Sequence, residues 1–410
     1  MRILFALPHC PIPVDSGSKQ LTMQAIEALA GRHEVGFVVL RGPDRTERID
    51  DLAQFGTLSV VDAPHRRSLV HRAGYRAAYV LSSLVTGRPL HSFYGCPANF
   101  WRTVQNVTGR WEPDLIHYDF WYSAVRDGGG LQCRRLLLEQ DVEFVRLFRE
   151  AELQSSFRRW RLERAAGIVR KAEGSVLRRM DCVLTVTPAD ARAAKEAGAR
   201  RVAVFPVGVD TESRTPPASE PGGQGILFVG GFVHRPNVDG ILWFARSVFP
   251  RILRVHPGAT LTIVGGGPPE SVRELGRSNG QIRVTGWVDD VTPFYHSARV
   301  VVAPLRFGSG IKTKVLEAMA FGRPVVTTTI GVEGIEISPG ENILVQDSPD
   351  GFAEAVSLLL GHPEQARALG LAGRAVVERF YSKKAARQRI LEIYEKDCWA
   401  PGSVSEGQSS

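Results

Sequence analysis

The chain has 410 residues, of which 43 % are hydrophobic and 23 % charged, and its formal net charge at pH 7 is +8. This length exceeds what one hydrophobic core usually serves, so we expect two domains, and the composition excludes a chain that is disordered throughout. No apolar run approaches the roughly 20 residues of a membrane span, and the run before Pro8 is too short for a secretory signal. The sequence therefore predicts a packed protein of the cytoplasm.

The cysteines are few and widely spaced: Cys10, Cys96, Cys133, Cys182 and Cys398. An odd number without a Cys-x-x-Cys pair argues against a disulfide framework and against a zinc knuckle. Single histidines such as His9, His234 and His296 also lack the spacing of metal ligands. We therefore expect a reducing compartment and no bound metal.

Short β-branched runs alternate with helical stretches along most of the chain. In the first half we expect strands at residues 2–7, 34–40, 57–62, 114–119, 135–140, 182–187 and 201–206. In the second half we expect strands at residues 225–231, 260–266, 281–286, 299–304, 324–329 and 342–347. Such nearly continuous apolar runs are typical of parallel sheets that helices cover on both faces. The sequence therefore predicts an α/β fold.

Residues 210–225 are rich in Pro, Ser and Gly, which is typical of a linker rather than a packed element. This linker separates two predicted doubly wound, Rossmann-like domains, residues 1–209 and 226–382. We expect a helix at 383–398, whereas residues 399–410 have too little apolar surface to fold. Ligands of such sheets bind outside the carboxyl ends of the strands, so the site is expected in a cleft that the two domains face.

The excess of basic residues is N-terminal. Residues 144–179 contain ten Arg or Lys and four Glu. Nucleic acid, anionic lipid or a phosphorylated substrate could use this surface, and the alternative is a solvated arginine-rich helix face. Residues 65–89 mix Arg, Tyr and Leu at roughly helical spacing, which indicates either an interfacial helix on anionic lipid or an ordinary surface helix.

A glycine-rich loop precedes a helical run in "RFGSGIKTKVLEAMAFGRPVV", residues 306–326. The loop follows the strand at 299–304, and the helical run ends at Gly322. A helix N-terminus after a glycine loop presents amide N–H groups and partial positive charge, which suits a phosphate. Lys312 and Lys314 add positive charge at the same place, and a bound anion would offset the cost of placing them there.

Glu317 lies about one turn further along this helical run, among apolar residues. A carboxylate accepts hydrogen bonds from the two vicinal hydroxyls of a ribose, so a nucleotide is one ligand that would explain it. The alternative is an internal ion pair with Lys314 or with an arginine.

The segment "PLRFGSGIKTKVLEAMAFGRPVVTT" resembles the signature of glycosyltransferase family 4, the retaining nucleotide-sugar transferases of the GT-B fold. The likeness extends over most of the chain. It also includes the opening "PHCPIPVDSGSKQLTMQAIEALAGRHEVGFVVL", "DLIHYD", "PVGVDT", "ILFVGGFVHRPNVDGILWF" and "VTGWVDDVTPFYHSARVVVAP". The resemblance implies a GT-B fold with two Rossmann-like domains and a last helix that crosses back to the first domain.

The resemblance also implies roles at the matching positions. Glu317 would hold the donor's ribose, Trp287 and Val288 would flank the base, and Gly17 would face the donor phosphate from the first domain. The loop and helix start would hold the diphosphate and sugar through Gly308, Ser309, Gly310, Ile311, Lys312 and Lys314.

The sequence departs from the family pattern in three places that bear on the site. Ser309 stands where relatives commonly carry a glutamate that contacts the transferred sugar. Asp119 replaces a histidine near the reacting carbon, and either Asp119 or His117 would serve the acceptor. Where relatives carry Arg and Lys after the second domain's first strand, this chain reads "GGFVHRPN", in which Gly231 and Arg235 are candidates for donor contact.

Retaining transfer from a nucleoside diphosphate requires stabilisation of the negative charge that develops on the leaving phosphate. Lys312, Lys314 and helix N–H groups are expected to supply it, and these two lysines join Asp119 and His117 as candidate catalytic residues. The sequence contains no Asp-x-Asp triplet of the kind that holds a divalent ion at a diphosphate. We therefore expect a metal-independent reaction without a cofactor.

The sequence predicts a glycosyltransferase that moves a sugar from a nucleotide-diphosphate donor to a saccharide or lipid-linked acceptor. Polysaccharide or glycolipid assembly at the inner face of the plasma membrane would suit the family and the basic first half. Two alternatives stay open: a nucleotide-sugar epimerase or hydrolase of the same fold, and a catalytically weak protein that binds sugar nucleotides. Nucleic acid is not expected as a partner, because the basic segment lacks stacking aromatic residues beyond Trp160.

Overall fold

The computed structural model describes residues 1–14, 16–42, 47–63, 96–128 and 130–398. The chain divides into two compact units. The N-terminal unit contains Met1–Pro206 and the residues from Arg387 onward, and the C-terminal unit contains Val207–Ala386. The helix predicted at 65–89 and the disordered tail predicted at 399–410 lie outside the described residues.

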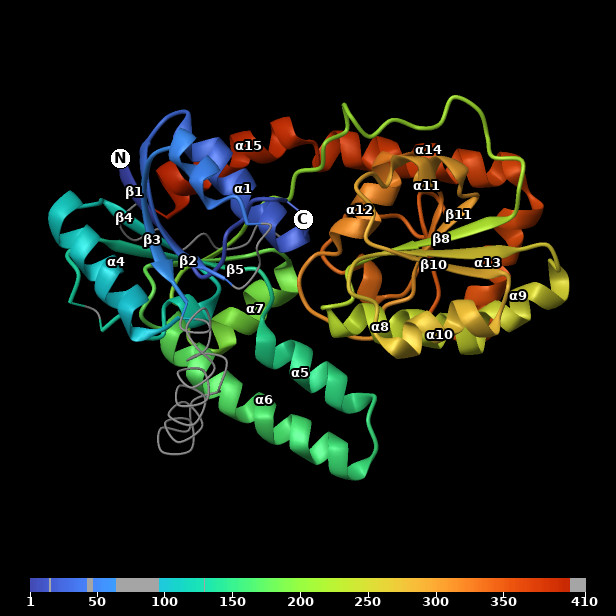
Figure 1. Ribbon diagram of the computed structural model, residues 1–410, viewed down its shortest axis with the longest axis horizontal. Coiled ribbons are helices and arrows are strands. Elements are labelled where there is room, and N and C mark those ends of the chain that lie inside the picture. Colours follow the sequence, from blue (N-terminus) through green and yellow to red (C-terminus); the bar gives the residue numbers. More distant parts are fainter. Residues whose placement is uncertain (15, 43–46, 64–95, 129, 399–410) are drawn as a thin grey trace. The chain divides into compact units, whose positions relative to one another are not determined.

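The N-terminal unit is built on a parallel seven-stranded sheet in the order β3-β2-β1-β4-β5-β6-β7 (Figure 1). Its strands are β1 (Arg2–Leu7), β2 (Glu34–Arg41), β3 (Thr57–Asp62), β4 (Leu115–Asp119), β5 (Arg134–Glu139), β6 (Cys182–Thr185) and β7 (Val202–Val204). Ile3 on β1 pairs with Val35 on one side and with Leu115 on the other. The strand order therefore changes direction between β1 and β4, which is the switch point of a doubly wound sheet.

Helices cover this sheet. They are α1 (Gly17–Ala30), α4 (Ala98–Trp111), α5 (Glu143–Glu152), α6 (Ser156–Leu177), α7 (Pro188–Glu196) and α15 (Lys383–Glu392). Local sequence explains two of the helix starts. The Ser16 hydroxyl accepts a hydrogen bond from the Lys19 N–H at the start of α1, and Thr187 caps α7 with Pro188 in its first turn.

The C-terminal unit has a parallel six-stranded sheet in the order β10-β9-β8-β11-β12-β13. Its strands are β8 (Gly225–Val229), β9 (Thr260–Val264), β10 (Ile282–Gly286), β11 (Val300–Ala303), β12 (Val325–Thr327) and β13 (Leu344–Val345). Its helices are α8 (Arg235–Trp243), α9 (Phe249–Val255), α10 (Glu270–Ser278), α11 (Thr292–Ser297), α12 (Thr313–Ala320), α13 (Pro349–Gly361) and α14 (Pro363–Phe380). This sheet is also doubly wound, with its switch point between β8 and β11.

The apolar runs lie in the two sheets as predicted. Each of the thirteen segments predicted to be strands contains a strand of the structure. β1, β4 and β11 are buried along nearly their whole length, because helices pack on both faces of each sheet. The expectation of two doubly wound α/β domains is confirmed.

The Pro- and Ser-rich segment 210–225 contains no helix, and only its last residue, Gly225, lies in a strand. Side chains of the C-terminal unit nevertheless hold it. Arg374 donates hydrogen bonds to the carbonyl oxygens of Thr211 and Arg214, at 3.0 and 2.5 Å. The guanidinium of Arg323 pairs with the Glu220 carboxylate at 3.1 Å. This segment therefore lies with the C-terminal unit, which contains Val207–Ala386.

The last helix lies with the N-terminal unit from Arg387 onward. The Tyr394 hydroxyl lies 2.6 Å from Nδ1 of His117, and both side chains are buried. At the surface, Arg32 pairs with Glu395 at 3.3 Å. This placement agrees with the return of the chain that the family resemblance implies.

The structure contains a disulfide between Cys182 and Cys398, which are separated by 216 residues in the sequence. The cysteine spacing argued against a disulfide framework, and it did not predict this single bond. The return of the C-terminal helix brings Cys398 to the start of β6, a proximity that spacing in the sequence does not reveal. Cys10, Cys96 and Cys133 are free thiols.

None of the helices within the described ranges combines the length and apolar composition that crossing a bilayer requires.

Candidate functional site

The loop between β11 and α12 contains the predicted glycine-rich segment. Gly308 has φ 141° and Gly310 has φ 69°, values in the left-handed region that only glycine adopts at low cost. Ser309 between them is buried. Lys312 stands at the N-cap of α12, and its ammonium donates to the carbonyl oxygens of Ser309 at 3.2 Å and Gly310 at 2.5 Å. The buried Lys312 thus holds the loop closed against the start of the helix.

Lys314 lies in the first turn of α12 and reaches the end of β8. Its Nζ donates a hydrogen bond to Oδ1 of Asn237 and lies 5.0 Å from the ring centroid of Phe228. Nδ2 of Asn237 in turn donates to the carbonyl oxygen of Gly231 at 2.7 Å. Desolvation, followed by the nearby Lys312 charge, lowers the pKa of Lys314 to about 7, and Glu317 opposes this shift.

Two polar side chains pack closely against the glycine turn after β8. A Cβ on Gly230 would lie 2.7 Å from Nζ of Lys314 and 2.9 Å from Nδ2 of Asn237. Gly231 has open space around its Cβ position, and the neighbouring Arg235 begins α8 with an exposed side chain. The turn therefore brings Gly231, Asn237 and Lys314 together.

Glu317 follows one turn after Lys314, and its carboxylate is already paired. Oε1 accepts hydrogen bonds from Nε and Nη2 of Arg214, at 3.0 and 2.7 Å. Oε2 accepts one from the buried Tyr295 hydroxyl at 3.2 Å. Of the two alternatives that the sequence left open, the pairing with an arginine is present. Because a carboxylate has about four acceptor positions, Oε2 retains capacity for a ligand hydroxyl.

Trp287 and Val288 follow β10 beside the glycine turn that ends β9. The Trp287 side chain is 59 % exposed. Its ring lies against Gly266, where a Cβ would be 3.3 Å from Cε3. The indole N–H donates to the Asp289 carboxylate at 3.4 Å. An exposed indole against a bare backbone offers a flat apolar surface on which a planar ring can stack.

These features share one place in the fold. Gly231 follows β8, Gly266 follows β9, Trp287 follows β10, and the loop to α12 follows β11, so all stand at the carboxyl ends of the parallel strands. β8 and β11 flank the switch point, where open α/β sheets bind their ligands.

In the N-terminal unit, Gly17 begins α1 directly after its cap, and Asp119 ends β4. Asp119 is fully buried: Oδ2 accepts from the Thr22 hydroxyl at 2.5 Å and Oδ1 from the Gln140 amide at 2.7 Å. Burial raises the pKa of Asp119 to about 7, although these two hydrogen bonds oppose the shift. The carboxylate is thus enclosed by its two donors, and a catalytic role for Asp119 stays a prediction.

His117 is also enclosed, between the rings of Phe5 and Tyr394, whose centroids lie 4.7 and 5.9 Å away. Its Nδ1 is paired with the Tyr394 hydroxyl, and burial lowers its pKa to about 3. In this position the side chain packs the C-terminal helix onto β4, and its catalytic role stays a prediction.

The variant Asp119→Asn tests whether the Asp119 carboxyl is buried with a raised pKa. The folded pKa of about 7 exceeds the ordinary value of 3.8, so stability is greatest below 3.8 and falls as the pH rises to 7. Asp119→Asn removes this dependence. Between pH 5 and 7 the free energy of unfolding of the unchanged protein should fall by roughly 2 kcal/mol relative to that of the variant, since one pKa unit corresponds to about 1.4 kcal/mol. Urea unfolding at both pH values measures the difference, and equal losses would show that Asp119 ionises normally.

Comparison with known proteins places the chain in a family. Residues 16–213 match the family model described as Glycosyltransferase Family 4, and residues 223–362 match that of Glycosyl transferases group 1. A GDP-mannose-dependent alpha-(1-6)-phosphatidylinositol monomannoside mannosyltransferase of Mycobacterium tuberculosis is 32 % identical over 289 residues, 60 % of this chain and 73 % of that protein. The chain belongs to glycosyltransferase family 4.

Two further similarities bear on this glycosyltransferase. An uncharacterized 44.6 kDa protein in the cps region of Klebsiella pneumoniae is 28 % identical, but the match spans only 32 % of this chain and 36 % of that protein. The Anabaena protein HepE, solved in complex with UDP and glucose, superposes with a TM-score of 0.68 at 15 % identity. That match covers 97 % of this chain and all of the other, and it establishes the GT-B fold.

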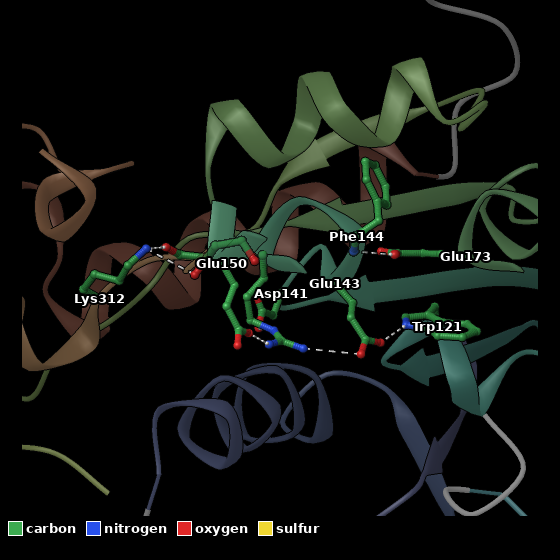
Figure 2. A network of polar contacts seen from close by, with 10 residues as sticks. Trp121, Asp141, Glu143, Phe144, Glu150, Glu173 and Lys312 are labelled. Atoms are coloured by element: carbon green, nitrogen blue, oxygen red, sulfur yellow. Dashed lines mark hydrogen bonds and ion pairs between the residues drawn. The ribbon is translucent and has the colours of Figure 1, made fainter. Parts of the chain in front are cut away.

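The glycosyltransferase also contains a polar network that sequence reasoning missed (Figure 2). It lies around the carboxyl end of β5. The buried Glu139 accepts from the Trp121 backbone N–H at 2.9 Å, and the buried Glu173 accepts from the Phe144 N–H at 3.3 Å. Burial raises the pKa of both carboxyls, and the charge of Glu173 raises that of Glu139 further.

An arginine occupies the centre of the same network. Arg146 on α5 lies 3.4 Å from Glu143, 3.5 Å from Glu150 and 3.7 Å from Asp141. The acidic run "EQDVE", residues 139–143, was the available sequence signal, and it begins at the last residue of β5. Helical periodicity alone does not show that its carboxylates lie close together. The network ties α5 and α6 to the sheet.

Among the residues that the structure describes, no three His, Cys, Asp or Glu side chains are grouped so that they could hold a metal ion. The carboxylates labelled in Figure 2 are instead paired, Asp141, Glu143 and Glu150 with Arg146, and Glu173 with the Phe144 N–H. Metal independence of this glycosyltransferase stays a prediction.

Proposed function

We propose that the protein transfers a sugar, with retention, from a nucleoside-diphosphate donor in the C-terminal unit to a saccharide or lipid-linked hydroxyl acceptor. One observation carries the proposal: Lys314 and the N-terminus of α12 lie beside the Gly230–Gly231 turn, with Glu317 one turn further along. This arrangement offers cationic and N–H donors to a diphosphate and a carboxylate to a ribose. The same site requires neither a metal nor a cofactor in our proposal.

The chemistry follows from the charge that develops during transfer. When the bond between the anomeric carbon and the diphosphate breaks, negative charge collects on the leaving phosphate oxygen. The Lys314 ammonium and the N–H groups at the start of α12 would stabilise it there. Trp287 would stack on the base, and Glu317 would accept from the ribose hydroxyls.

The names of related proteins support the substrate class. The mycobacterial relative is named for GDP-mannose, whereas HepE is solved with UDP and glucose. These proteins differ in nucleotide and sugar, and the present chain carries Ser309 where a sugar-contacting glutamate is common in the family. The donor is therefore proposed as a nucleoside-diphosphate hexose, and the acceptor as part of a polysaccharide or glycolipid made at the inner face of the plasma membrane.

A thermal-shift screen with UDP-, GDP-, ADP- and TDP-sugars tests donor binding. Specific binding should raise the unfolding free energy by about 2.7 kcal/mol when the free ligand is 100 times its dissociation constant. The binding donor is then assayed with saccharide and lipid-linked acceptors in the presence of EDTA. Full transfer in EDTA is expected, and loss of transfer that Mg²⁺ restores would contradict metal independence.

Two other outcomes would contradict the proposal itself. Turnover of the donor at the same rate with and without acceptors would indicate a hydrolase or epimerase. Saturable donor binding with no turnover by any acceptor would indicate a binding protein. Absence of stabilisation by every sugar nucleotide would remove the donor-site assignment.

A further inference from the structure

Helix α6 of the N-terminal unit presents one face to the core and the opposite face to solvent. Ala166, Val169 and Glu173 form part of the buried face. The opposite face carries one row of exposed side chains at helical spacing, which we name the outward row: Phe157, Trp160, Arg161, Arg164, Ile168 and Lys171. At 3.6 residues per turn these six positions lie within one stripe of the helix.

The two aromatic side chains of the outward row are largely exposed to solvent. Phe157 is 68 % exposed and Trp160 is 56 % exposed, and their rings stack on one another with centroids 6.1 Å apart. Leu153 adds an exposed apolar side chain in the turn between α5 and α6. In Figure 1 these two helices form a hairpin that extends from the sheet of their unit. Clustered exposed aromatics at such a tip indicate a binding surface rather than scattered surface apolar residues.

The charged members of the outward row are cations without acidic partners. Among the described residues, no ion pair links Arg161, Arg164 or Lys171 to a carboxylate, and the guanidinium of Arg161 lies 6.0 Å from the Phe157 ring centroid. Residues 156–171 contain six Arg or Lys and a single acid, Glu163, which pairs with Arg159. The row therefore joins apolar area to unpaired positive charge.

We propose that the outward row, together with Leu153, docks the protein on an anionic lipid surface. Trp side chains prefer the headgroup level of a bilayer, Phe and Leu side chains insert at the boundary with the acyl chains, and neighbouring arginines are attracted to anionic lipids. Stacked aromatic rings with a flanking arginine also suit shallow insertion, since the rings enter and the guanidinium remains at the interface. This inference goes beyond the proposed transfer reaction, and it is tested without any sugar substrate.

The test is co-sedimentation of the full chain with vesicles. One set contains phosphatidylcholine alone, and the other contains phosphatidylcholine mixed with phosphatidylglycerol. Binding is expected only to the anionic vesicles and should weaken as salt is raised, because salt screens exposed charges. Phe157→Ala/Trp160→Ala should weaken it by more than tenfold. Arg161→Gln/Arg164→Gln should weaken it by about fivefold for each arginine removed.

Matched variants elsewhere control for exposure and charge. Leu371→Ala/Phe380→Ala removes two exposed apolar side chains from α14, and Arg254→Gln/Arg367→Gln removes two exposed arginines of the C-terminal unit. Both controls should bind vesicles like the unchanged chain. All variants should melt at the same temperature, since exposed side chains contribute little to stability.

Four outcomes would overturn the proposal. The first is failure of the unchanged chain to bind anionic vesicles, and the second is equal binding to neutral vesicles. The third is an equal loss of binding in the control variants. The fourth is a protein dimer that disappears in Phe157→Ala/Trp160→Ala while vesicle binding does not change. The last result would assign the row to a second copy of the chain.

Discussion

Glu317→Ala is expected to weaken binding of the nucleoside diphosphate by about 1.5–3 kcal/mol, because the one charge-assisted hydrogen bond that Oε2 can still accept from the ribose hydroxyls is lost. At 25 °C this corresponds to a dissociation constant raised about 10- to 150-fold. Isothermal titration with the nucleotide that stabilises the protein most in the thermal-shift screen measures the change. An unchanged affinity in a folded variant would refute the ribose assignment.

The pairing of Glu317 with Arg214 makes a control necessary. Removing the carboxylate also leaves the Arg214 guanidinium without its partner, and a free cation near the site could alter affinity by itself. The control is the corresponding 2′,3′-dideoxy nucleotide, which lacks both hydroxyls. If Glu317 binds the ribose, the unchanged protein loses affinity for this analogue, and Glu317→Ala causes little further loss. Equal losses by the variant for both nucleotides would assign the effect to Arg214.

Arg214→Gln separates the two contributions. The Arg214 carbonyl is held by Arg374, so the segment stays in place when the side chain is shortened. We expect a smaller effect on nucleotide affinity than that of Glu317→Ala, since Tyr295 still holds Oε2 of the carboxylate. A larger effect would show that Arg214, not Glu317, is the main contact of the nucleotide.

The fold was predictable because its signal is local and repeated. Runs such as residues 2–7 and 299–304 are apolar on both faces, and that pattern has one main explanation, a parallel sheet covered by helices. The order of the strands in each sheet was not predicted, because it depends on how the crossovers return and not on the pattern within any one strand. The disulfide from Cys182 to Cys398 was missed because it depends on the return of the last helix.

The geometry of the candidate donor site was predictable where one segment contains the whole motif. The glycine loop, Lys314 and Glu317 lie within ten residues of one another, and the structure places them at one helix start. Their partners come from distant parts of the chain. Asn237 lies in the quoted "HRPN" but was not singled out, and Arg214 lies in a segment that the sequence presented as a linker.

The surroundings of the two acceptor-side candidates, His117 and Asp119, could not be predicted from the sequence. His117 and Asp119 are polar residues at the end of a strand, which is where catalytic groups of such sheets are found. Sequence alone does not show that Tyr394, 277 residues after His117, covers this position, or that Thr22 and Gln140 take up the Asp119 carboxylate. The placement of these two polar residues at a strand end could therefore be predicted, their partners could not, and their catalytic roles stay predictions.

Lys314→Met is expected to lower kcat about 100- to 1,000-fold, because the variant keeps the length of the side chain but loses the cation that faces the leaving phosphate. KM for the donor should rise as well, since the same cation faces the diphosphate in the bound ground state, while Trp287, Glu317 and the helix N-terminus still bind the donor. Steady-state kinetics with the identified donor and acceptor measure both constants. Lys195→Met, an exposed lysine at the end of α7, is the matched control and should be fully active.

The depressed pKa of Lys314 gives this prediction a second readout. With a pKa of about 7, most of the free protein carries a neutral Lys314 at pH 8, whereas a bound diphosphate favours the ammonium form. Donor binding at pH 8 should therefore take up nearly one proton, which titration calorimetry in buffers of different ionisation enthalpy detects. Lys314→Met should bind without proton uptake. If kcat falls but the variant still takes up the proton, another group faces the phosphate and Lys314 acts by holding Asn237 and the Gly231 turn in place.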